Sequence, residues 1–244
     1  MKAKIGINGL GRIGRMVLRS VFEENYKGIK VNHINNKADI ITACDLIKRD
    51  SIHGIFKGKV SVEKNKLIIN GNKITYSQEN NLSKISWKKY NVDIVFECTG
   101  KFNSKDKLIS HIKNGAKKVI VSAPCKSADK TIVYGVNHTN ISKKDKIISA
   151  ASCTTNCLAP VVYVLNNNFE IEKGFMTTIH SYTSDQRMLD NSHKDPRRAR
   201  SAGLSIVPTS TGASKAIGEI IPSLKGKLEG VAMRVPTPNV SLVE

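Results

Sequence analysis

Aromatic residues are scarce in this chain of 244 residues, where Phe, Trp and Tyr together make up only 5%. The sequence has no aromatic RNA-binding motif, so it does not favour the modules that stack single-stranded bases on aromatic rings. No apolar run is long enough to span a membrane, and the first residues lack the apolar core of a signal peptide. We therefore expect a soluble, globular, cytoplasmic protein without a membrane or nucleic-acid partner.

The cysteines lack the pattern of a disulfide framework. Their number, five, is odd, and none belongs to a C-x-x-C pair, which indicates reduced thiols in a cytosol. Cys153 and Cys157 lie four residues apart. This spacing is compatible with a redox pair or with half of a metal site. No second cluster of ligands accompanies it, so we expect no bound metal.

Acidic residues are also few, since 20 Asp and Glu stand against 39 Lys and Arg and give a formal net charge of +19. A chain this basic admits binding to nucleic acid. The lysines are scattered, however, which favours a solvated surface that attracts anionic metabolites. Arginine is absent between Arg49 and Arg187 and then returns. Because guanidinium groups bind phosphate in a fork, the second half of the chain is where we expect an anion site.

A glycine motif opens the chain. The apolar run 3–8 predicts a buried strand, and a G-x-G-x-x-G motif with helical periodicity follows it. Gly9 allows a tight turn, Gly11 lets the backbone approach a pyrophosphate, and Gly14 lets the helix pack on the strand. This context predicts a dinucleotide fold, and the alternative is a glycine-rich turn in an unrelated α/β protein.

Predicted strands and helices alternate through the first half, which indicates a doubly wound, mostly parallel sheet. Strands are predicted at 3–8, 30–35, 93–97, 118–122, 131–134 and 147–148, a hairpin at 60–76, and helices at 38–48 and 105–114. Ligands bind beyond the carboxyl ends of such strands. The residues at these ends are Gly9, Asn36, Thr99, Ser122 and Cys153. We expect an α/β, Rossmann-type nucleotide domain over 1–152, followed by an incomplete α+β catalytic domain over 153–244.

Cys153 lies where a predicted strand turns into a helix. The partial positive charge and free N–H groups of a helix N-terminus favour a thiolate. Ser152 and Thr154 add hydroxyls that can hold an anion there. His180, in the strand-like run 175–180, is the candidate base for the thiol. The alternative is that Cys153 is a small buried hydrophobic residue.

The region after the predicted base is less regular. Residues 181–203 are long, polar and basic, which predicts an ordered functional loop. Thr211 and Gly212 precede a predicted helix at 213–221. They mark another helix N-terminus where phosphate can bind.

Residues 150–160, A-A-S-C-T-T-N-C-L-A-P, resemble almost letter for letter the active-site segment of phosphorylating glyceraldehyde-3-phosphate dehydrogenase. The resemblance extends over the whole chain, through 7–15, 122–124, 149–160, 176–185, 193–200, 208–213 and 234–241. It implies that Cys153 is the nucleophile and His180 its base. The thiolate would add to an aldehyde, hydride would leave to a nicotinamide, and phosphate would release an acyl phosphate from the thioester.

The resemblance also implies binding residues and an assembly. The implied cofactor-binding residues are Gly9, Gly11, Arg12, Ile13, Gly14, Asn36, Thr99, Gly100, Ser122 and Ser192. The residues implied for the substrate's phosphate are Thr183, Asp185 and Arg234, and those for inorganic phosphate are Ser152, Thr154, Thr211 and Gly212. In the family's homotetramer, the loop 181–203 reaches the cofactor of a neighbouring subunit.

Three departures from the family pattern carry expectations. Asn36 replaces the aspartate usual in NAD-specific members, and Ser192 is the residue found in NADP-using members, so we expect NADP to be accepted as well as NAD. An amide does not repel a 2′-phosphate, and Lys37 can attract one. Cys98 replaces a common serine beside the cofactor. The family's chain continues beyond Glu244, so we expect a C-terminally truncated fragment.

The leading prediction is a glycolytic or gluconeogenic oxidoreductase of the cytoplasm. It would convert glyceraldehyde 3-phosphate, phosphate and NAD(P)⁺ to 1,3-bisphosphoglycerate and NAD(P)H. Two alternatives stay open. A close relative would oxidise erythrose 4-phosphate, and a protein of a different class would be an inactive, basic nucleotide- or RNA-binding fragment.

Overall fold

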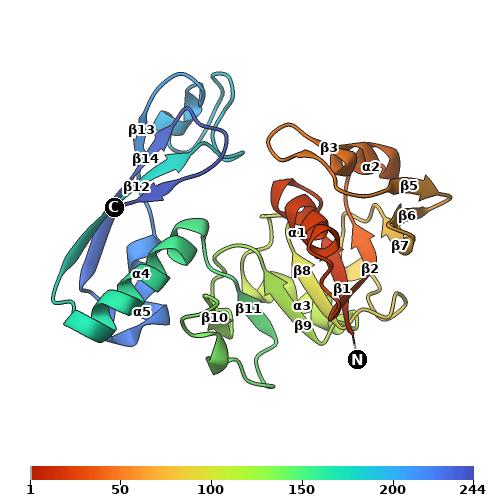
Figure 1. Ribbon diagram of the computed structural model, residues 1–244, viewed down its shortest axis with the longest axis horizontal. Helices are drawn as coiled ribbons and strands as arrows, with labels where there is room; N and C mark the ends of the chain where they lie inside the picture. The colour runs from red at the N-terminus through yellow and green to blue at the C-terminus, as the bar shows by residue number, and fades with distance from the viewer. Residues whose placement is uncertain (1) are drawn as a thin grey trace. The chain divides into compact units, whose positions relative to one another are not determined.

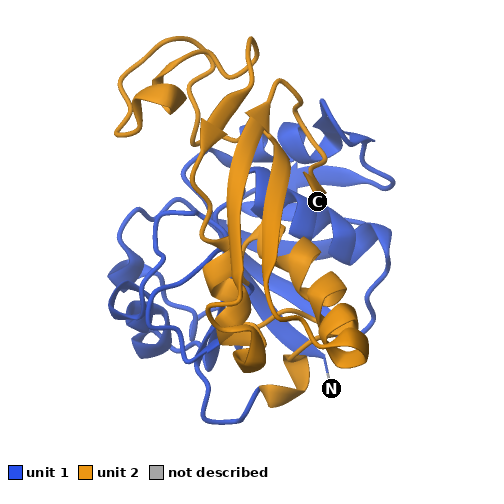
Figure 2. Cartoon of the chain, turned by 90° about the vertical axis from the view of Figure 1, so that its left-hand side faces the viewer, with its two compact units in different colours: residues 1–131, 141–150 blue, residues 132–140, 151–244 orange. Residues whose placement is uncertain are grey.

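The computed structural model describes residues 2–244, which form two compact units (Figure 2). Unit 1 comprises the residues up to 131 together with 141–150, and unit 2 comprises residues 132–140 and 151–244. No helix in the described chain combines the length and apolar character needed to cross a lipid bilayer.

A nine-stranded sheet forms the centre of unit 1 (Figure 1). Its strands are β1 (Ala3–Asn8), β2 (Ile29–Asn35), β5 (Val60–Glu63), β6 (Lys66–Ile69), β7 (Asn72–Ser77), β8 (Ile94–Glu97), β9 (Lys118–Val121), β10 (Lys130–Thr131) and β11 (Ile147–Ser149). They lie in the order β10-β11-β9-β8-β1-β2-β7-β6-β5. Every pairing from β10 to β7 is parallel, and only β7-β6-β5 is antiparallel. The predicted mostly parallel α/β sheet is therefore confirmed.

The helices and smaller elements of unit 1 follow the predicted alternation. They are α1 (Arg12–Glu23), α2 (Ile40–Lys48), α3 (Lys105–Lys113), the short pair β3 (Arg49–Asp50) and β4 (Gly54–Ile55), and the 3₁₀ turn η1 (Leu82–Lys84). Helix α2 begins two residues later than predicted because Asp39 caps it by accepting hydrogen bonds from Ile41 N and Thr42 N. Buried side chains such as Ile5 and Leu18 join β1 to α1 in one core, and Figure 1 shows this helix beside the sheet.

One predicted strand of the first half is mostly wrong. The apolar run 131–134 was expected to form a strand, but β10 ends at Thr131. Residues 132–140 belong to unit 2, where they include the 3₁₀ turn η2 (His138–Asn140). Val133 is buried there in the second hydrophobic core. The run is apolar because of that packing, and not because it continues the sheet.

Unit 2 is a four-stranded sheet with two helices, which confirms the expected α+β organisation. Its elements are α4 (Cys153–Phe169), β12 (Gly174–Ser181), η3 (Pro196–Ala199), β13 (Val207–Thr209), α5 (Ala213–Ile220), η4 (Pro222–Leu224), β14 (Leu228–Val235) and β15 (Leu242–Val243). The strand order is β13-β14-β12-β15, and only the long central pair β12-β14 is parallel. Leu158 of α4, Ile217 of α5 and Met176 of β12 share a buried core.

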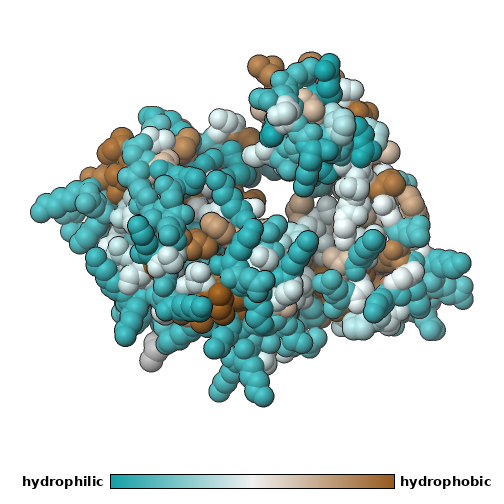
Figure 3. Space-filling view, turned by 180° about the vertical axis from the view of Figure 1, so that it is seen from behind, coloured by the Kyte–Doolittle hydropathy of each residue, from teal (hydrophilic) through white to brown (hydrophobic). Residues whose placement is uncertain are grey.

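Hydrophilic side chains cover most of the face of the molecule drawn in Figure 3, with small apolar patches between them. This agrees with the scattering of the lysines along the sequence. A scattered charge of this kind keeps a protein hydrated and does not by itself define a binding groove.

Candidate active site

Cys153 begins helix α4 directly after a sharp turn. Ala151 adopts a positive φ of 59°, a conformation that costs an L-residue roughly 1–2 kcal/mol. Ser152 is the N-cap of α4, and its Oγ accepts a hydrogen bond from the Thr155 N–H at 3.0 Å. The predicted strand-to-helix turn is therefore confirmed, and Cys153 lies at the positive end of the helix.

Cys153 and His180 lie within hydrogen-bonding distance, and both belong to unit 2. The distance from Cys153 Sγ to His180 Nε2 is 3.1 Å. Cys153 is exposed, whereas only 6% of His180 is exposed. The alternative of a small buried hydrophobic residue is therefore wrong.

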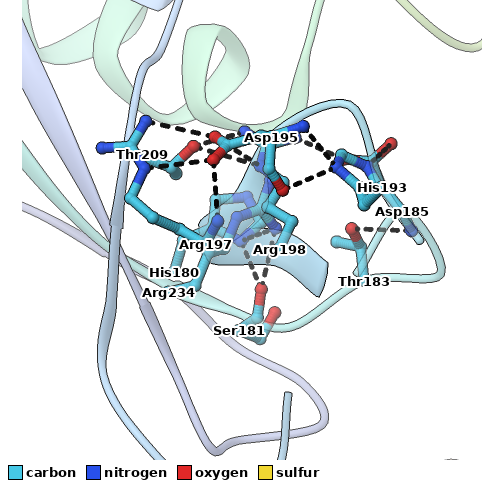
Figure 4. Close-up of polar contacts among 10 residues, drawn as sticks. All are labelled: His180, Ser181, Thr183, Asp185, His193, Asp195, Arg197, Arg198, Thr209 and Arg234. Atoms are coloured by element: carbon cyan, nitrogen blue, oxygen red, sulfur yellow. Dashed lines mark hydrogen bonds and ion pairs between the residues drawn. The ribbon is translucent and has the colours of Figure 1, made fainter. Parts of the chain in front are cut away.

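The parallel strands β12 and β14 orient the histidine. Their register pairs His180 with Arg234. Arg234 Nη1 lies 2.9 Å from His180 Nδ1 and donates to the Ser181 carbonyl oxygen at 2.9 Å (Figure 4). The same carbonyl lies 2.7 Å from His180 Nδ1. These contacts hold the inner edge of the ring, so that Nε2 faces the thiol.

The surroundings of Cys153 favour its thiolate. The pKa of Cys153 is lowered to about 7, chiefly by the hydrogen bond from His180. Burial acts in the opposite direction and raises this pKa, whereas hydrogen bonds from Thr154 lower it further. In unit 1, by contrast, burial raises the pKa of Cys98 to about 11. The thiolate is the nucleophilic form of cysteine. The lower pKa therefore favours Cys153 over Cys98 as the reactive thiol.

Alkylation of Cys153 by iodoacetamide should follow a pH profile with its midpoint near the pKa of about 7. The thiolate fraction should rise from about one tenth at pH 6 to about nine tenths at pH 8. Mass spectrometry of the Cys153 peptide after brief alkylation measures this profile. A Cys157→Ser variant, which removes the other exposed thiol of α4, should leave it unchanged. A midpoint at about 8.5, the ordinary value for cysteine, would contradict the prediction.

Two arginines, Arg198 and Arg234, lie near His180 (Figure 4). Arg198 donates to Thr209 Oγ1 from Nε at 3.1 Å and from Nη2 at 2.7 Å, and it forms an ion pair with Asp185. Arg234 is partly buried, and within residues 2–244 its Nε has no hydrogen-bond partner. Burial and the nearby charge of Arg198 lower the pKa of Arg234. Two guanidinium groups held this way form a candidate anion site.

The other predicted phosphate residues occupy turns and helix ends of unit 2. Thr183 Oγ1 accepts a hydrogen bond from Asp185 N at 3.4 Å. Thr211 Oγ1 accepts one from Ala213 N at 3.2 Å, and Gly212 is the N-cap of α5. Thr211 and Gly212 therefore lie at the helix N-terminus that the sequence predicted. Within residues 2–244, no hydrogen bond or ion pair joins the α5 cap directly to Arg198 or Arg234.

Unit 1 contains a pocket of about 220 Å³ at the carboxyl ends of β1, β2 and β8. The predicted cofactor residues that line it are Gly9, Gly11, Asn36 and Thr99, and Cys98 lines it as well. Arg12, Ile13, Gly14, Gly100 and Ser122 are not among its lining residues. The side chain of Arg12 is held by Asp50 at 2.5 Å. Ser192 lies in unit 2, where it lines an open hollow with Arg187, His193 and Lys194.

The glycines of the motif shape this pocket for a dinucleotide. Gly9 has a φ of +94°, and a Cβ there would lie 2.9 Å from Thr99 N. A Cβ on Gly14 would lie 1.9 Å from the Gly9 carbonyl oxygen, so a side chain would separate helix from strand. Apart from Gly11 and its two chain neighbours, no atom of residues 2–244 lies within 4 Å of a Cβ built on Gly11. The backbone is therefore open to a ligand at Gly11, which fits the close approach of a pyrophosphate.

Sequence reasoning misses Arg198 and Thr209 as site residues. The available signal is the return of arginine after Arg187, which locates the region but not the side chain. Only the pairing of β13 with β14 brings Thr209 into the neighbourhood of Arg234. The two missed residues thus depend on a non-local contact.

Two family models match this chain. The model for the NAD binding domain of glyceraldehyde 3-phosphate dehydrogenase matches residues 3–105. The model for the C-terminal domain of the same enzyme matches residues 152–244. The two matches contain the glycine motif and the Cys153–His180 pair, respectively.

Named bacterial proteins resemble the chain over its full length. It is 53% identical to glyceraldehyde-3-phosphate dehydrogenase 2 of Bacillus subtilis, 51% identical to the enzyme of Geobacillus stearothermophilus and 50% identical to that of Zymomonas mobilis. It spans 72% of the length of the first two relatives and 73% of the third. These relatives do not favour the erythrose 4-phosphate or RNA-binding alternatives. The chain therefore belongs to the glyceraldehyde-3-phosphate dehydrogenase family.

Proposed function

We propose that the chain oxidises glyceraldehyde 3-phosphate, with phosphate and NAD, through a thioester on Cys153. The observation that carries this proposal is the 3.1 Å contact between Cys153 Sγ and His180 Nε2 beside two arginines. Residues 1–152 would hold the nucleotide, and residues 153–244 would hold the substrate and the reacting sulfur. The glycine-shaped pocket of unit 1 fits a dinucleotide, which accepts a hydride when it is bound.

The chain's own residues would act in this order. The Cys153 thiolate attacks the aldehyde carbon, forming a C–S bond and an alkoxide that takes the proton from His180 Nε2. His180 Nε2 accepts that hydroxyl proton as hydride leaves the same carbon, and a thioester remains. An oxygen of inorganic phosphate then attacks the thioester carbon, and the Cys153 sulfur leaves as a thiolate. The products are the acyl phosphate and the free enzyme.

Phosphate groups would be held by the charges of unit 2. Arg234, with its unpartnered Nε, suits the substrate's phosphate, and Arg198 suits an anion nearby. Thr183 and the hydroxyls of Ser152, Thr154 and Thr211 would add neutral donors. A carboxylate repels phosphate, so we assign Asp185 to orienting Arg198 and His193, with which it pairs. This refines the sequence-based role of Asp185 as a direct phosphate contact.

The test is formation of NADH by the purified chain, followed by its absorbance. Absorbance should rise only when glyceraldehyde 3-phosphate, inorganic phosphate and NAD are all present. Omitting phosphate should leave at most one equivalent of NADH per Cys153, because the thioester is then not cleaved by phosphate. Equal turnover without phosphate would reject the phosphorolysis step.

We also propose that NADP is accepted. Asn36 Oδ1 accepts a hydrogen bond from Leu10 N at 3.1 Å, and its Nδ2 donates to Tyr76 Oη at 3.1 Å, so the amide is fixed in the pocket. Lys37 and Lys101 line the same pocket. The adjacent ammonium group of Lys101 lowers the pKa of Lys37, and an anion between the two would relieve their repulsion.

An Asn36→Asp variant should shift the cofactor preference toward NAD by about tenfold or more. The aspartate keeps the acceptor for Leu10 N but places a negative charge where a 2′-phosphate would lie. Dissociation constants for NAD and NADP, measured by calorimetry on both proteins, give the ratio. A Lys37→Ala variant serves as the matched comparison, because it should weaken NADP without weakening NAD. An unchanged ratio in Asn36→Asp would contradict the proposal.

We also propose that the protein is a homotetramer and acts in the cytoplasm. In the tetramer, Ser192 would meet the cofactor of a neighbouring subunit. Size-exclusion chromatography with light scattering measures the number of subunits. A monomer that binds NADP as tightly as NAD would show that Ser192 is not needed for NADP binding.

A further inference from the structure

A buried carboxylate lies beneath the nucleotide pocket and has no part in the reaction described above. Glu97 ends β8 and is 1% exposed. Its Oε2 accepts hydrogen bonds from Asn8 Nδ2 at 2.6 Å and from His111 Nε2 at 3.0 Å. Its Oε1 accepts one from Thr99 N at 2.8 Å and a second from Thr99 Oγ1. Each of these partner groups among residues 2–244 carries an N–H or O–H, so all four contacts can be donated to the carboxyl oxygens of Glu97.

The tautomer of His111 follows from a tryptophan. Trp87 Nε1 lies 2.8 Å from His111 Nδ1, and an indole nitrogen can only donate. His111 Nδ1 must therefore accept, which puts the ring proton on Nε2, where it is donated to Glu97. A proton on both ring nitrogens would face the Trp87 N–H, so the histidine is neutral. The carboxyl group of Glu97 is thus buried among partners that can all donate to it.

The donors on Glu97 also build the wall of the pocket. Asn8 and Thr99 both line it. Asn8 Oδ1 accepts from Asn35 Nδ2 at 2.8 Å, and Asn35, another lining residue, is held in turn by the Glu79 backbone. One hydrogen-bonded network therefore ties the ends of β1, β2 and β8 together at the point where the nucleotide would bind.

Glu97 also determines which side of Thr99 meets the glycine turn. Both polar donors of Thr99 are engaged by the carboxylate. Its methyl Cγ2 is then left against Gly9, 2.9 Å from where a Cβ would stand. Thr99 therefore packs closely against the backbone of Gly9. A change in the Thr99 turn would displace the glycine turn.

We propose that Glu97 is a positioning residue for the dinucleotide: its buried carboxylate fixes the Asn8–Gly9 and Thr99 turns in the shape that receives the cofactor. Burying a charge costs more than burying an amide, and an amide would suffice for joining strands. A carboxylate alone offers four acceptor sites to donors converging from three directions. The inference rests on the proposed nucleotide pocket.

A Glu97→Gln variant tests the proposal, since it keeps the size but turns two acceptor sites into donors that face other donors. The dissociation constant for NAD, measured by calorimetry at pH 8, should rise by about tenfold to a hundredfold. A Glu97→Asp variant keeps a carboxyl group on a side chain one methylene shorter. It should bind NAD more tightly than Glu97→Gln. If Glu97→Gln does not fold, Thr99→Val gives the same test, because it removes one donor with little change of shape and should weaken NAD severalfold.

Trp87→Phe separates positioning from general stability. It removes the N–H that meets His111 Nδ1 but none of the four donor groups on Glu97. The melting temperature should fall while NAD affinity stays within about twofold of the unchanged chain. Unaltered NAD affinity in a folded Glu97→Gln or Thr99→Val variant would overturn this inference alone. If the unchanged chain binds no NAD, the nucleotide pocket itself is wrong, and the inference falls with it.

Discussion

Replacing Cys153 with serine is expected to reduce phosphate-dependent oxidation of glyceraldehyde 3-phosphate by roughly 10³-fold or more. The thiol has a pKa of about 7 beside His180, so a large share of it is thiolate at neutral pH. A serine hydroxyl in the same position ionises far less readily, and the thioester that phosphate must attack would become a much less reactive ester. Steady-state NADH formation at saturating substrate measures the effect.

The matched control is Cys157→Ser, four residues along the same helix. Cys157 is also exposed, but no contact with His180 is found for it in the described chain. This variant should keep the turnover of the unchanged protein, and Cys153→Ser should keep its affinity for NAD, because the nucleotide pocket lies in unit 1. Turnover within tenfold of the unchanged protein in Cys153→Ser would show that Cys153 is not the nucleophile.

Local signals made two turns readable from the sequence. The G-x-G-x-x-G turn and the strand-to-helix turn at Cys153 are each encoded within a few residues, and both lie where they were predicted. The strand predicted at 131–134 was mostly wrong because burial against helices and burial in a sheet select the same apolar residue types. The sequence predicts where helix α4 begins but not that it extends to Phe169, because its exposed end carries little apolar periodicity.

Contacts between distant segments could not be read in this way. His180 and Arg234 are 54 residues apart and meet only because β12 and β14 pair in one particular register. Glu97 looked like the polar end of a strand, yet besides its near neighbour Thr99 its partners are Asn8, 89 residues away, and His111, 14 residues away. Sequence reasoning therefore predicts the elements well, but not the side chains that distant segments bring together.

Replacing His180 with asparagine is expected to lower turnover by roughly 10²- to 10⁴-fold, the usual contribution of a general base. Asparagine can still accept a hydrogen bond from Arg234 Nη1, which lies 2.9 Å from His180 Nδ1. It cannot accept the proton of the hydroxyl at which hydride leaves. The matched control is His53→Asn, at an exposed histidine of unit 1, which should leave turnover unchanged.

The two roles of His180 can be separated by pH. Without its hydrogen bond, the pKa of Cys153 should rise from about 7 toward its ordinary value, so the iodoacetamide profile should shift upward. At pH 9, Cys153 of the His180→Asn variant should again be largely thiolate. Its alkylation should then match that of the unchanged chain. Turnover at pH 9 should remain low, because the hydride step still lacks its base. Recovery of turnover together with alkylation would mean that His180 serves only to ionise the thiol.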